Sequence, residues 1–360
     1  MKIKPSLGSY VQSGRNNNFN LMRIVAAILV MFQHSFSITT GDMDNEPLRA
    51  YLGMGIGSIA VDIFFITSGF LVVKSLITKN SLKGFIFSRV IRIYPALIVS
   101  VVLTTVILEA YFNADNFFRM FMSVKTMKYL FCNSTIIFRH ELRLPGVFLK
   151  NPFGSMVNAS LWTLRYEVQL YSSLVVFAMI ATIFTNNKIK FLKIVLLLAP
   201  VAVLGTYAYA WGPTYVEDSF LRLFYLFYTG GAYYIIKDRV LLEYKYLILA
   251  LVAIVLSVSV SKDMYICTYI TVVPYVVLFL AYVPSGQIRK YNEVGDYSYG
   301  MYIYAWPIQQ FLVALFKGIN AFQMFVLSFL ITFVFAYISW HVVEKRCLIL
   351  KSLKPRCQVI

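Results

Sequence analysis

The segment RIVAAILVMFQHS, residues 23–35, decides the fold. It is an apolar run that carries polar groups only at its two ends, Arg23 at one and Gln33 to Ser35 at the other. About 20 mostly apolar residues suffice for an α-helix to cross the hydrocarbon of a bilayer. We therefore expect a membrane-spanning helix that begins near Leu21 and contains two groups, Arg23 and His34, that are costly to place in hydrocarbon.

Composition places the whole chain in the same class. Of the 360 residues, 59% are hydrophobic and only 14% are charged, and the mean hydropathy is +0.70. These values exclude a water-facing globule and indicate an integral membrane protein. The net charge of +17 would suit nucleic acid, but the basic residues lie in short segments between apolar runs. We therefore expect no nucleic-acid partner and take the charge as a sign of topology.

Apolar runs of spanning length recur along the chain. They begin near Leu21, Gly57, Ile93, Leu161, Phe191, Phe220, Tyr246, Tyr265, Tyr297 and Phe322. The sequence thus predicts an all-α, polytopic integral membrane protein with about ten transmembrane helices. Its expected parts are an N-terminal tail over residues 1–20, a membrane domain over residues 21–343 and a basic tail over residues 344–360.

The basic residues predict the orientation. If the amino terminus is cytosolic, the inside segments are 2–15, 79–92, 188–193, 237–245, 289–290 and 345–356, and they contain most of the lysines and arginines. The short outside connections contain only Arg49, Lys262 and Lys317. Because positive charge is retained on the cytosolic side, we expect both termini inside. The long connection over residues 113–160 would then be extracytoplasmic, and long ordered loops often carry function or cover a site.

Arg23 and His34 share one face of the first predicted helix. They are eleven positions apart, so they point within about 20° of the same direction and differ in depth by about 16 Å. One ligand could touch both. A histidine that hydrogen-bonds a neighbouring helix explains the same residues equally well, so the pattern alone leaves the two interpretations open.

Other polar groups accompany later spans. Asp62 and Ser68 lie in the second, where Ser68 and Gly69 permit close helix packing. Arg89 and Arg92, three positions apart and followed by Tyr94, suit the phosphates of a cytosolic ligand or of lipid equally. The fourth span opens with Trp162 and Glu167 at the outer interface. Four cysteines show no metal-ligand spacing, and we expect no metal.

The order of these motifs over essentially the whole chain resembles acyltransferase family 3, a family of membrane O-acyltransferases. The matching residues are Arg23 and His34; Phe64, Phe65, Ser68, Gly69 and Phe70; Arg89, Arg92, Ile93, Tyr94 and Pro95; Trp162, Thr163, Leu164 and Glu167; Ser298, Tyr299, Tyr302 and Pro307; and Val343, Glu344 and Lys345. Many members also have a histidine just before the aromatic-Pro pair of the ninth span, where this chain has Ala305. That departure concentrates the proton chemistry on His34.

The resemblance implies transfer of an acyl group, commonly acetyl, from cytosolic acyl-CoA to a hydroxyl of an extracytoplasmic or lipid-linked polysaccharide. It implies a place in the cytoplasmic (inner) membrane of a bacterium, with acyl-CoA, a glycan acceptor and membrane lipid as partners. We expect His34, Arg23 and Glu167 to act in catalysis and Arg89, Arg92, Tyr94 and Arg23 to bind the donor. Trp162, Asp62 and Ser68 are expected to bind the acceptor.

Two alternatives keep part of this interpretation. A transporter or flippase of a glycan or lipid intermediate would also place arginine and histidine along an intramembrane path. Such proteins commonly contain inverted repeats with broken helices, and we detect no repeat in the sequence. Acylation of a lipid or another small hydrophobic alcohol keeps the chemistry and changes the acceptor.

Overall fold

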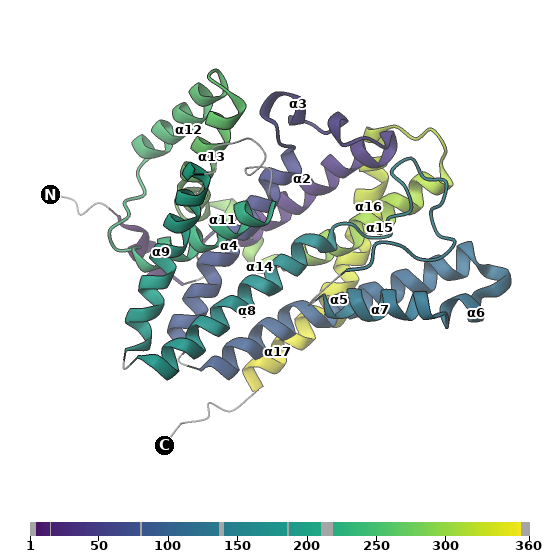
Figure 1. Cartoon of the computed structure of the whole chain (residues 1–360), viewed down its shortest axis with the longest axis horizontal. Helices are drawn as coiled ribbons and strands as arrows, with labels where there is room; N and C mark the ends of the chain where they lie inside the picture. The colour runs from purple at the N-terminus through teal and green to yellow at the C-terminus, as the bar shows by residue number, and fades with distance from the viewer. Residues whose placement is uncertain are drawn as a thin grey trace. The chain divides into compact units, whose positions relative to one another are not determined.

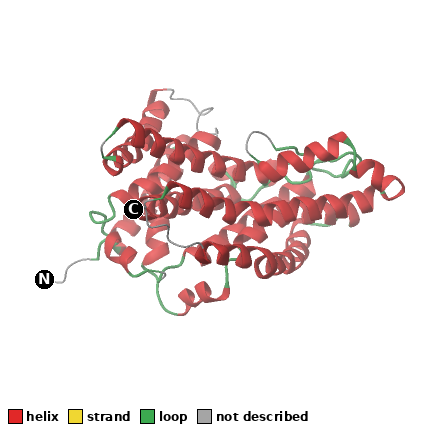
Figure 2. Ribbon diagram, turned by 90° about the horizontal axis from the view of Figure 1, so that it is seen from below, coloured by secondary structure: helices red, strands yellow, loops and turns green. Residues whose placement is uncertain are grey.

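The chain folds into helices joined by connections, as a computed structural model shows (Figure 1). The structure describes residues 5–14, 16–79, 81–136, 140–185, 187–209 and 219–353. Within these ranges it contains no strand, only an isolated antiparallel bridge between Ser6 and Leu241 (Figure 2). The predicted all-α class is confirmed. Five basic residues used to predict topology lie outside the described ranges, namely Lys2, Lys4, Arg15, Lys354 and Arg356.

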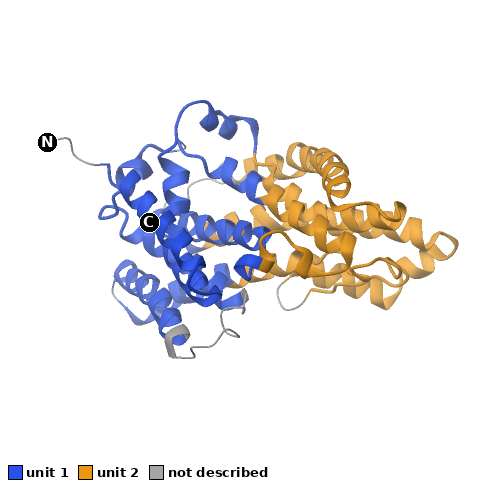
Figure 3. Cartoon of the chain, turned by 90° about the horizontal axis from the view of Figure 1, so that it is seen from above, with its two compact units in different colours: residues 1–26, 51–82, 170–295 blue, residues 27–50, 83–169, 296–360 orange. Residues whose placement is uncertain are grey.

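Two compact units make up the chain (Figure 3). Unit 1 comprises residues 1–26, 51–82 and 170–295, and unit 2 comprises residues 27–50, 83–169 and 296–360. The helices of unit 1 are α1 (Leu7–Gln12), α4 (Ile56–Lys79), α9 (Lys188–Tyr209), α11 (Ser219–Ile235), α12 (Tyr244–Val258), α13 (Lys262–Tyr282), η3 (Gln287–Lys290) and α14 (Tyr291–Val294). Those of unit 2 are η1 (Met43–Asn45), α5 (Leu82–Phe112), η2 (Ala114–Asn116), α6 (Phe117–Phe121), α7 (Val124–Thr135), α15 (Ser298–Leu315), α16 (Ala321–Ser339), η4 (Trp340–Glu344) and α17 (Lys345–Leu353). Residues of α2 (Phe19–Thr40), α3 (Arg49–Leu52) and α8 (Leu161–Phe184) belong to both units.

Seven stretches of helix within the described ranges are long and apolar enough to cross a membrane. They are α2, α4, α5, α8, residues 188–206 of α9, α13, and the continuous helical stretch of residues 321–350. Helices α11, α12 and α15 occupy the other predicted spans, but they are shorter or more polar. The membrane-spanning class is therefore supported, while the number ten and the orientation remain predictions.

Helix boundaries differ from the predicted spans at two places. Helix α5 begins at Leu82, well before the expected start near Ile93, so Arg89 and Arg92 lie within its first turns. At the other end of the chain the helical path continues through Glu344 to Leu353, where we expected only a tail. Hydropathy marks the part of a helix that crosses lipid, whereas backbone hydrogen bonding continues into the polar region beyond it.

Helices α4 and α11 form the tightest packing in unit 1. A Cβ atom at Gly69 would collide with the backbone of Phe227, and one at Gly230 would collide with the backbone of Ile66. Small residues let two helix backbones approach this closely and gain van der Waals contact without a hydrophobic driving force. The close approach expected at Gly69 is confirmed.

Helix α15 is the most enclosed helix of unit 2. Its polar and aromatic side chains Tyr302, Trp306, Gln309 and Gln310 are all buried. Gly300 lies against Ala336, so α15 and α16 also pack at close range. Since buried polar groups need partners, α15 is where hydrogen-bonded neighbours should gather.

Candidate active site

His34 lies on α2 against Trp306 of α15. The two rings meet edge to face, with centroids 4.7 Å apart and planes at 77°. The imidazole is partly exposed, but its Nδ1 is buried and has no hydrogen-bond partner among the described residues. The sequence placed His34 in a helix and gave no indication of this aromatic neighbour.

The turn of α2 that carries His34 is fixed to α15 by one buried side chain. Gln309 is 0% exposed, and its Nε2 donates to the backbone oxygen of Met31 at 2.9 Å and to Oγ of Ser35 at 2.8 Å. Gln309 thus binds residues on both sides of His34 in the sequence. This arrangement restricts the place of the imidazole without occupying its nitrogens.

A segment of the long connection, residues 151–160, runs along α15 in the direction opposite to the helix. The hydrogen bonds that join them include Asn151 Nδ2 to Gln310 O at 2.8 Å, Trp306 Nε1 to Met156 O at 3.0 Å, Asn158 Nδ2 to Ile303 O at 2.9 Å, and Tyr302 Oη to Ser160 O at 3.1 Å. Phe153 adds a ring contact to Trp306, with centroids 5.5 Å apart. The connection therefore covers the same part of α15 that His34 contacts.

Glu46 ties the next connection to α2. Its carboxylate is 6% exposed and forms an ion pair with Arg49, with Nη1 3.3 Å from Oε2. Gln33 and Ser37, which flank His34 in the sequence, also hydrogen-bond to the Glu46 carboxylate. Burial raises the pKa of Glu46 above the ordinary carboxyl value despite these partners, because the charged form loses its hydration.

Arg92, a predicted donor-binding residue, is already paired within unit 2. Its guanidinium forms an ion pair with Asp296, which also accepts a 2.5 Å hydrogen bond from Ser298 Oγ. Glu344 places a second negative charge near the same guanidinium. The sequence suggested phosphate binding at Arg92 and gave no sign of Asp296, which is 204 positions away.

Glu344 owes its inward position to an unusual turn. Residues Trp340–Glu344 form a π-helix between α16 and α17, and such turns are frequent at functional sites. The carboxylate is 4% exposed and accepts a 3.0 Å hydrogen bond from Ser339 Oγ, while its Oε2 has no hydrogen-bond partner among the described residues. Arg92 lies on α5, Asp296 just before α15 and Glu344 at the end of the π-helix, so three separate segments of unit 2 bring their charges together.

The two remaining candidates for the donor differ in their surroundings. Arg89 is partly exposed on α5, and its Nε donates to Ser88 Oγ at 3.4 Å. Tyr94 donates its hydroxyl to the backbone oxygen of Thr135 at 3.0 Å, which ties α5 to the end of α7.

Trp162 and Glu167 occupy the first turns of α8 in unit 2. The Trp162 ring packs edge to face on Tyr166, with centroids 5.6 Å apart. The carboxylate of Glu167 lies near the side chains of Tyr299 and Tyr302 of α15. Unit 2 therefore contains His34, Glu167 and Trp162 together with the arginines of α5.

The other predicted site residues belong to unit 1. Asp62 is 0% exposed, with Oδ1 3.2 Å from Nε of Arg222 and Oδ2 accepting from the Tyr269 hydroxyl at 3.0 Å. Ser68 shares a 2.7 Å hydrogen bond with the Tyr171 hydroxyl. Arg23 is partly exposed near the start of α2. Asp62 and Ser68 are thus already engaged by protein groups, and packing explains their burial.

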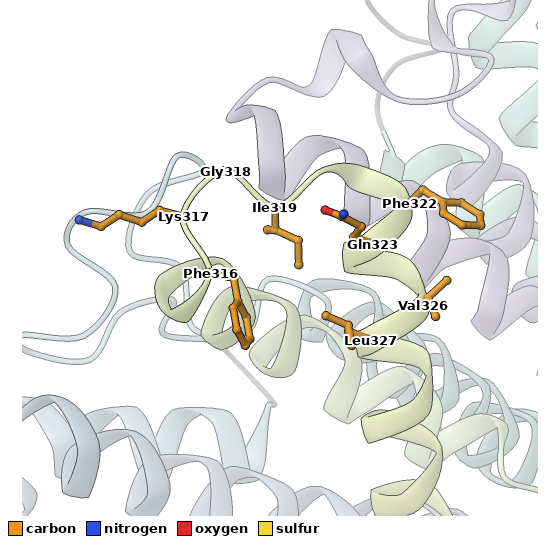
Figure 4. Close-up of a pocket in the computed structure, with 8 residues that line it drawn as sticks. All are labelled: Phe316, Lys317, Gly318, Ile319, Phe322, Gln323, Val326 and Leu327. Atoms are coloured by element: carbon orange, nitrogen blue, oxygen red, sulfur yellow. The ribbon is translucent and has the colours of Figure 1, made fainter.

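An open groove lies between the end of α15 and the start of α16 (Figure 4). It has a volume of about 570 Å³, and its lining is mostly apolar, with Phe316, Phe322 and Leu327 among its residues. None of the predicted site residues lines it. Within the described ranges, no cluster of three or more potential His, Cys, Asp or Glu metal ligands is present.

Apolar helices of spanning length that enclose a histidine and paired charges define a polytopic membrane protein with a polar site among its helices. The sequence model of the acyltransferase domain family matches residues 16–341. The chain therefore belongs to acyltransferase family 3, and the resemblance seen in its motifs is confirmed.

Two relatives agree with this assignment. The chain is 27% identical over 350 residues to an O-acetyl transferase of Shigella phage Sf6, a match that covers 94% of this chain and 98% of the relative. It is 41% identical over 90 residues to nodulation protein 10 of Rhizobium leguminosarum bv. viciae, covering 25% of this chain and 24% of that protein. No solved structure matches the chain.

Proposed function

We propose that this acyltransferase moves an acyl group, acetyl in the first instance, from acyl-CoA to a hydroxyl of an extracytoplasmic or lipid-linked polysaccharide. The observation that carries the proposal is the place of His34, a partly exposed residue whose ring packs on Trp306 and whose helical turn is held by Gln309; Trp306 in turn is bound by residues 151–160. The O-acetyl transferase relative, which matches over nearly its full length, supports the same reaction class. The proposed setting is the cytoplasmic (inner) membrane of a bacterium, with both termini cytosolic.

His34 acts in this proposal on the acceptor hydroxyl. A ring nitrogen takes the hydroxyl proton, the oxygen attacks the thioester carbonyl, and a tetrahedral oxyanion forms. The new C–O bond forms in this attack. When the oxyanion collapses, the carbonyl double bond reforms, the C–S bond breaks, and the CoA thiolate leaves and takes the proton back from the imidazolium. If His34 instead carries the acyl group, the same bonds are exchanged in two steps through an acyl-imidazole.

The donor is proposed to enter along α5. Arg89 makes the first contact with the CoA phosphates, because the guanidinium of Arg92 is already paired with Asp296. Tyr94 borders this path, and Arg23, near the start of α2, is a further candidate for contact with the donor. Trp162 offers an aromatic face to a sugar ring, and Glu167 adds an acceptor for its hydroxyls. Asp62 and Ser68 act through packing of unit 1, on the contacts described above.

Mass spectrometry of surface polysaccharide tests the function. Cells with the wild-type protein should show O-acetyl groups that cells without the protein, or with His34→Ala, lack. His140→Ala removes an imidazole from the long connection and serves as the matched control. Unchanged acylation in His34→Ala cells would refute the catalytic role. Unchanged acylation together with altered export in cells that lack the protein would favour a transporter, and acylated lipid in place of glycan would change the acceptor.

A further inference from the structure

Pro307 breaks the hydrogen-bond pattern inside α15. Proline has no N–H, so the backbone oxygen four positions earlier, on Ile303, loses its helical donor. At membrane depth an unpaired carbonyl is costly and must be satisfied by a neighbouring group. The carboxamide of Asn158 supplies the donor, with Nδ2 2.9 Å from the Ile303 oxygen.

That bond uses only half of the Asn158 carboxamide. The side chain is 5% exposed, and its Oδ1 is buried with no hydrogen-bond partner among the described residues. An amide oxygen accepts up to two hydrogen bonds, and leaving it buried and unpaired costs about 1–3 kcal/mol. A ligand that brings a hydroxyl to this atom would recover that cost.

The unpaired oxygen belongs to the neighbourhood of His34. Asn158 binds α15 at Ile303, less than one turn from Trp306, whose ring contacts His34. Met156, two residues before Asn158, accepts the indole hydrogen bond. Ser160, two residues after it, also has a buried Oγ with no partner in the described part of the chain. Unused polar atoms thus follow the same short segment that binds Trp306, the ring neighbour of the proposed catalytic base.

We propose that Oδ1 of Asn158 binds a hydroxyl of the acceptor, next to the hydroxyl that is acylated. The proposal rests on the function proposed above and narrows its acceptor to a molecule with at least two neighbouring hydroxyls, as sugars have. The reacting hydroxyl gives its proton to His34, so a second hydroxyl is the one free to donate to Asn158. Asn158 is then a residue of acceptor specificity, because a site built to bind a hydroxyl discriminates against molecules that lack it.

Pro307 makes it possible to separate binding from structure. Pro307→Ala returns an N–H to the helix, and this N–H can satisfy the Ile303 oxygen without Asn158. Asn158→Ala is compared in the wild-type and Pro307→Ala backgrounds. The assay follows acetyl transfer from radiolabelled acetyl-CoA to de-O-acetylated surface polysaccharide from cells that lack the protein.

We expect Asn158→Ala to raise the KM for the polysaccharide on the order of 10- to 100-fold in both backgrounds, the range of one lost hydroxyl contact. The KM for acetyl-CoA should stay unchanged. An effect that disappears in the Pro307→Ala background would assign Asn158 to structure alone and overturn the proposal. Absence of transfer by the wild-type protein is a separate result and would overturn the proposed function instead.

A second measurement applies if Pro307→Ala does not fold. Oligosaccharides released from the same polysaccharide should raise the melting temperature of the wild-type protein and not that of Asn158→Ala. Acetyl-CoA should stabilise both proteins equally. An equal shift by the oligosaccharides in the two proteins would overturn the role of Asn158.

Discussion

The indole of Trp306 is bound on one side to the backbone of Met156 and touches the imidazole of His34 on another. This single side chain links residues 151–160 to the proposed catalytic base. Displacement of the segment would change the packing of the indole against the imidazole. We therefore expect Trp306 to position His34.

Replacement of Trp306 tests that role. Trp306→Phe keeps an aromatic ring and loses the N–H bond to Met156, a net loss of about 1 kcal/mol, so we expect kcat to fall about fivefold. Trp306→Ala also removes the ring contact with His34, and we expect kcat to fall on the order of 100-fold. Both variants are tested by measuring the single-turnover rate as a function of pH. In the pH–rate profile of Trp306→Ala, the inflection assigned to His34 should be absent. If the variants lower only the yield of protein and leave kcat unchanged, Trp306 does not position His34.

The two arginines of α5 should separate binding from stability. Arg89→Ala removes a phosphate contact, so we expect the KM for acyl-CoA to rise about tenfold. Arg92→Ala leaves the buried carboxylate of Asp296 without its cation and should lower the melting temperature in detergent. The pair Arg92→Gln with Asp296→Asn should recover part of that loss. Equal melting temperatures for both alanine variants would argue against a structural Arg92.

The pair of Asp62 and Arg222 should matter to folding more than to turnover. Both side chains are nearly or fully buried, at 0% and 10% exposure. Asp62→Asn leaves the guanidinium unpaired and should cost about 3–5 kcal/mol of unfolding free energy, as for other broken buried pairs. Asp62→Leu combined with Arg222→Met should regain most of it. The free energy of unfolding is measured by denaturant titration in micelles. If Asp62 bound substrate instead, Asp62→Asn would change the KM for the acceptor and leave the free energy of unfolding unchanged.

Glu46 predicts a pH dependence of stability. Its pKa is raised in the folded protein by burial, so the folded state binds the proton more tightly than the unfolded chain does. The contribution of Glu46 to stability is fully present at pH values below its pKa in the unfolded chain. It is lost as the pH rises through its higher pKa in the folded protein. Glu46→Gln should flatten the melting temperature over that interval. A variant curve parallel to the wild-type curve would contradict the assignment.

Hydropathy could predict the helices because crossing lipid demands long apolar runs, as at residues 23–35. It could not predict that α5 begins at Leu82, because backbone hydrogen bonds continue where lipid contact ends. The class of the site was also predictable, since an imidazole such as His34 is rare within a span and the motif order is specific to the family.

The partners of each site residue were not predictable. Arg92 and Asp296 form their pair only after folding brings together positions that are far apart in sequence, and the same holds for Asp62 and Arg222. Asn158 lies near the end of the long connection over residues 113–160, which the sequence indicated as a possible cover of the site without indicating this residue. The one sequence feature related to Asn158 was Pro307. It leaves the Ile303 carbonyl in need of a donor but does not indicate which residue supplies it.

The π-helix at residues 340–344 sets the angle at which the chain leaves α16. A turn closed by i to i+5 bonds holds one residue more than an α-turn, so every side chain after it is rotated by about 100°. The direction in which the side chains of α17 point is therefore set by this extra residue as well as by the sequence of α17. Removal of one residue from the turn would rotate them by about 100°, while the apolar pattern of α16 would stay unchanged.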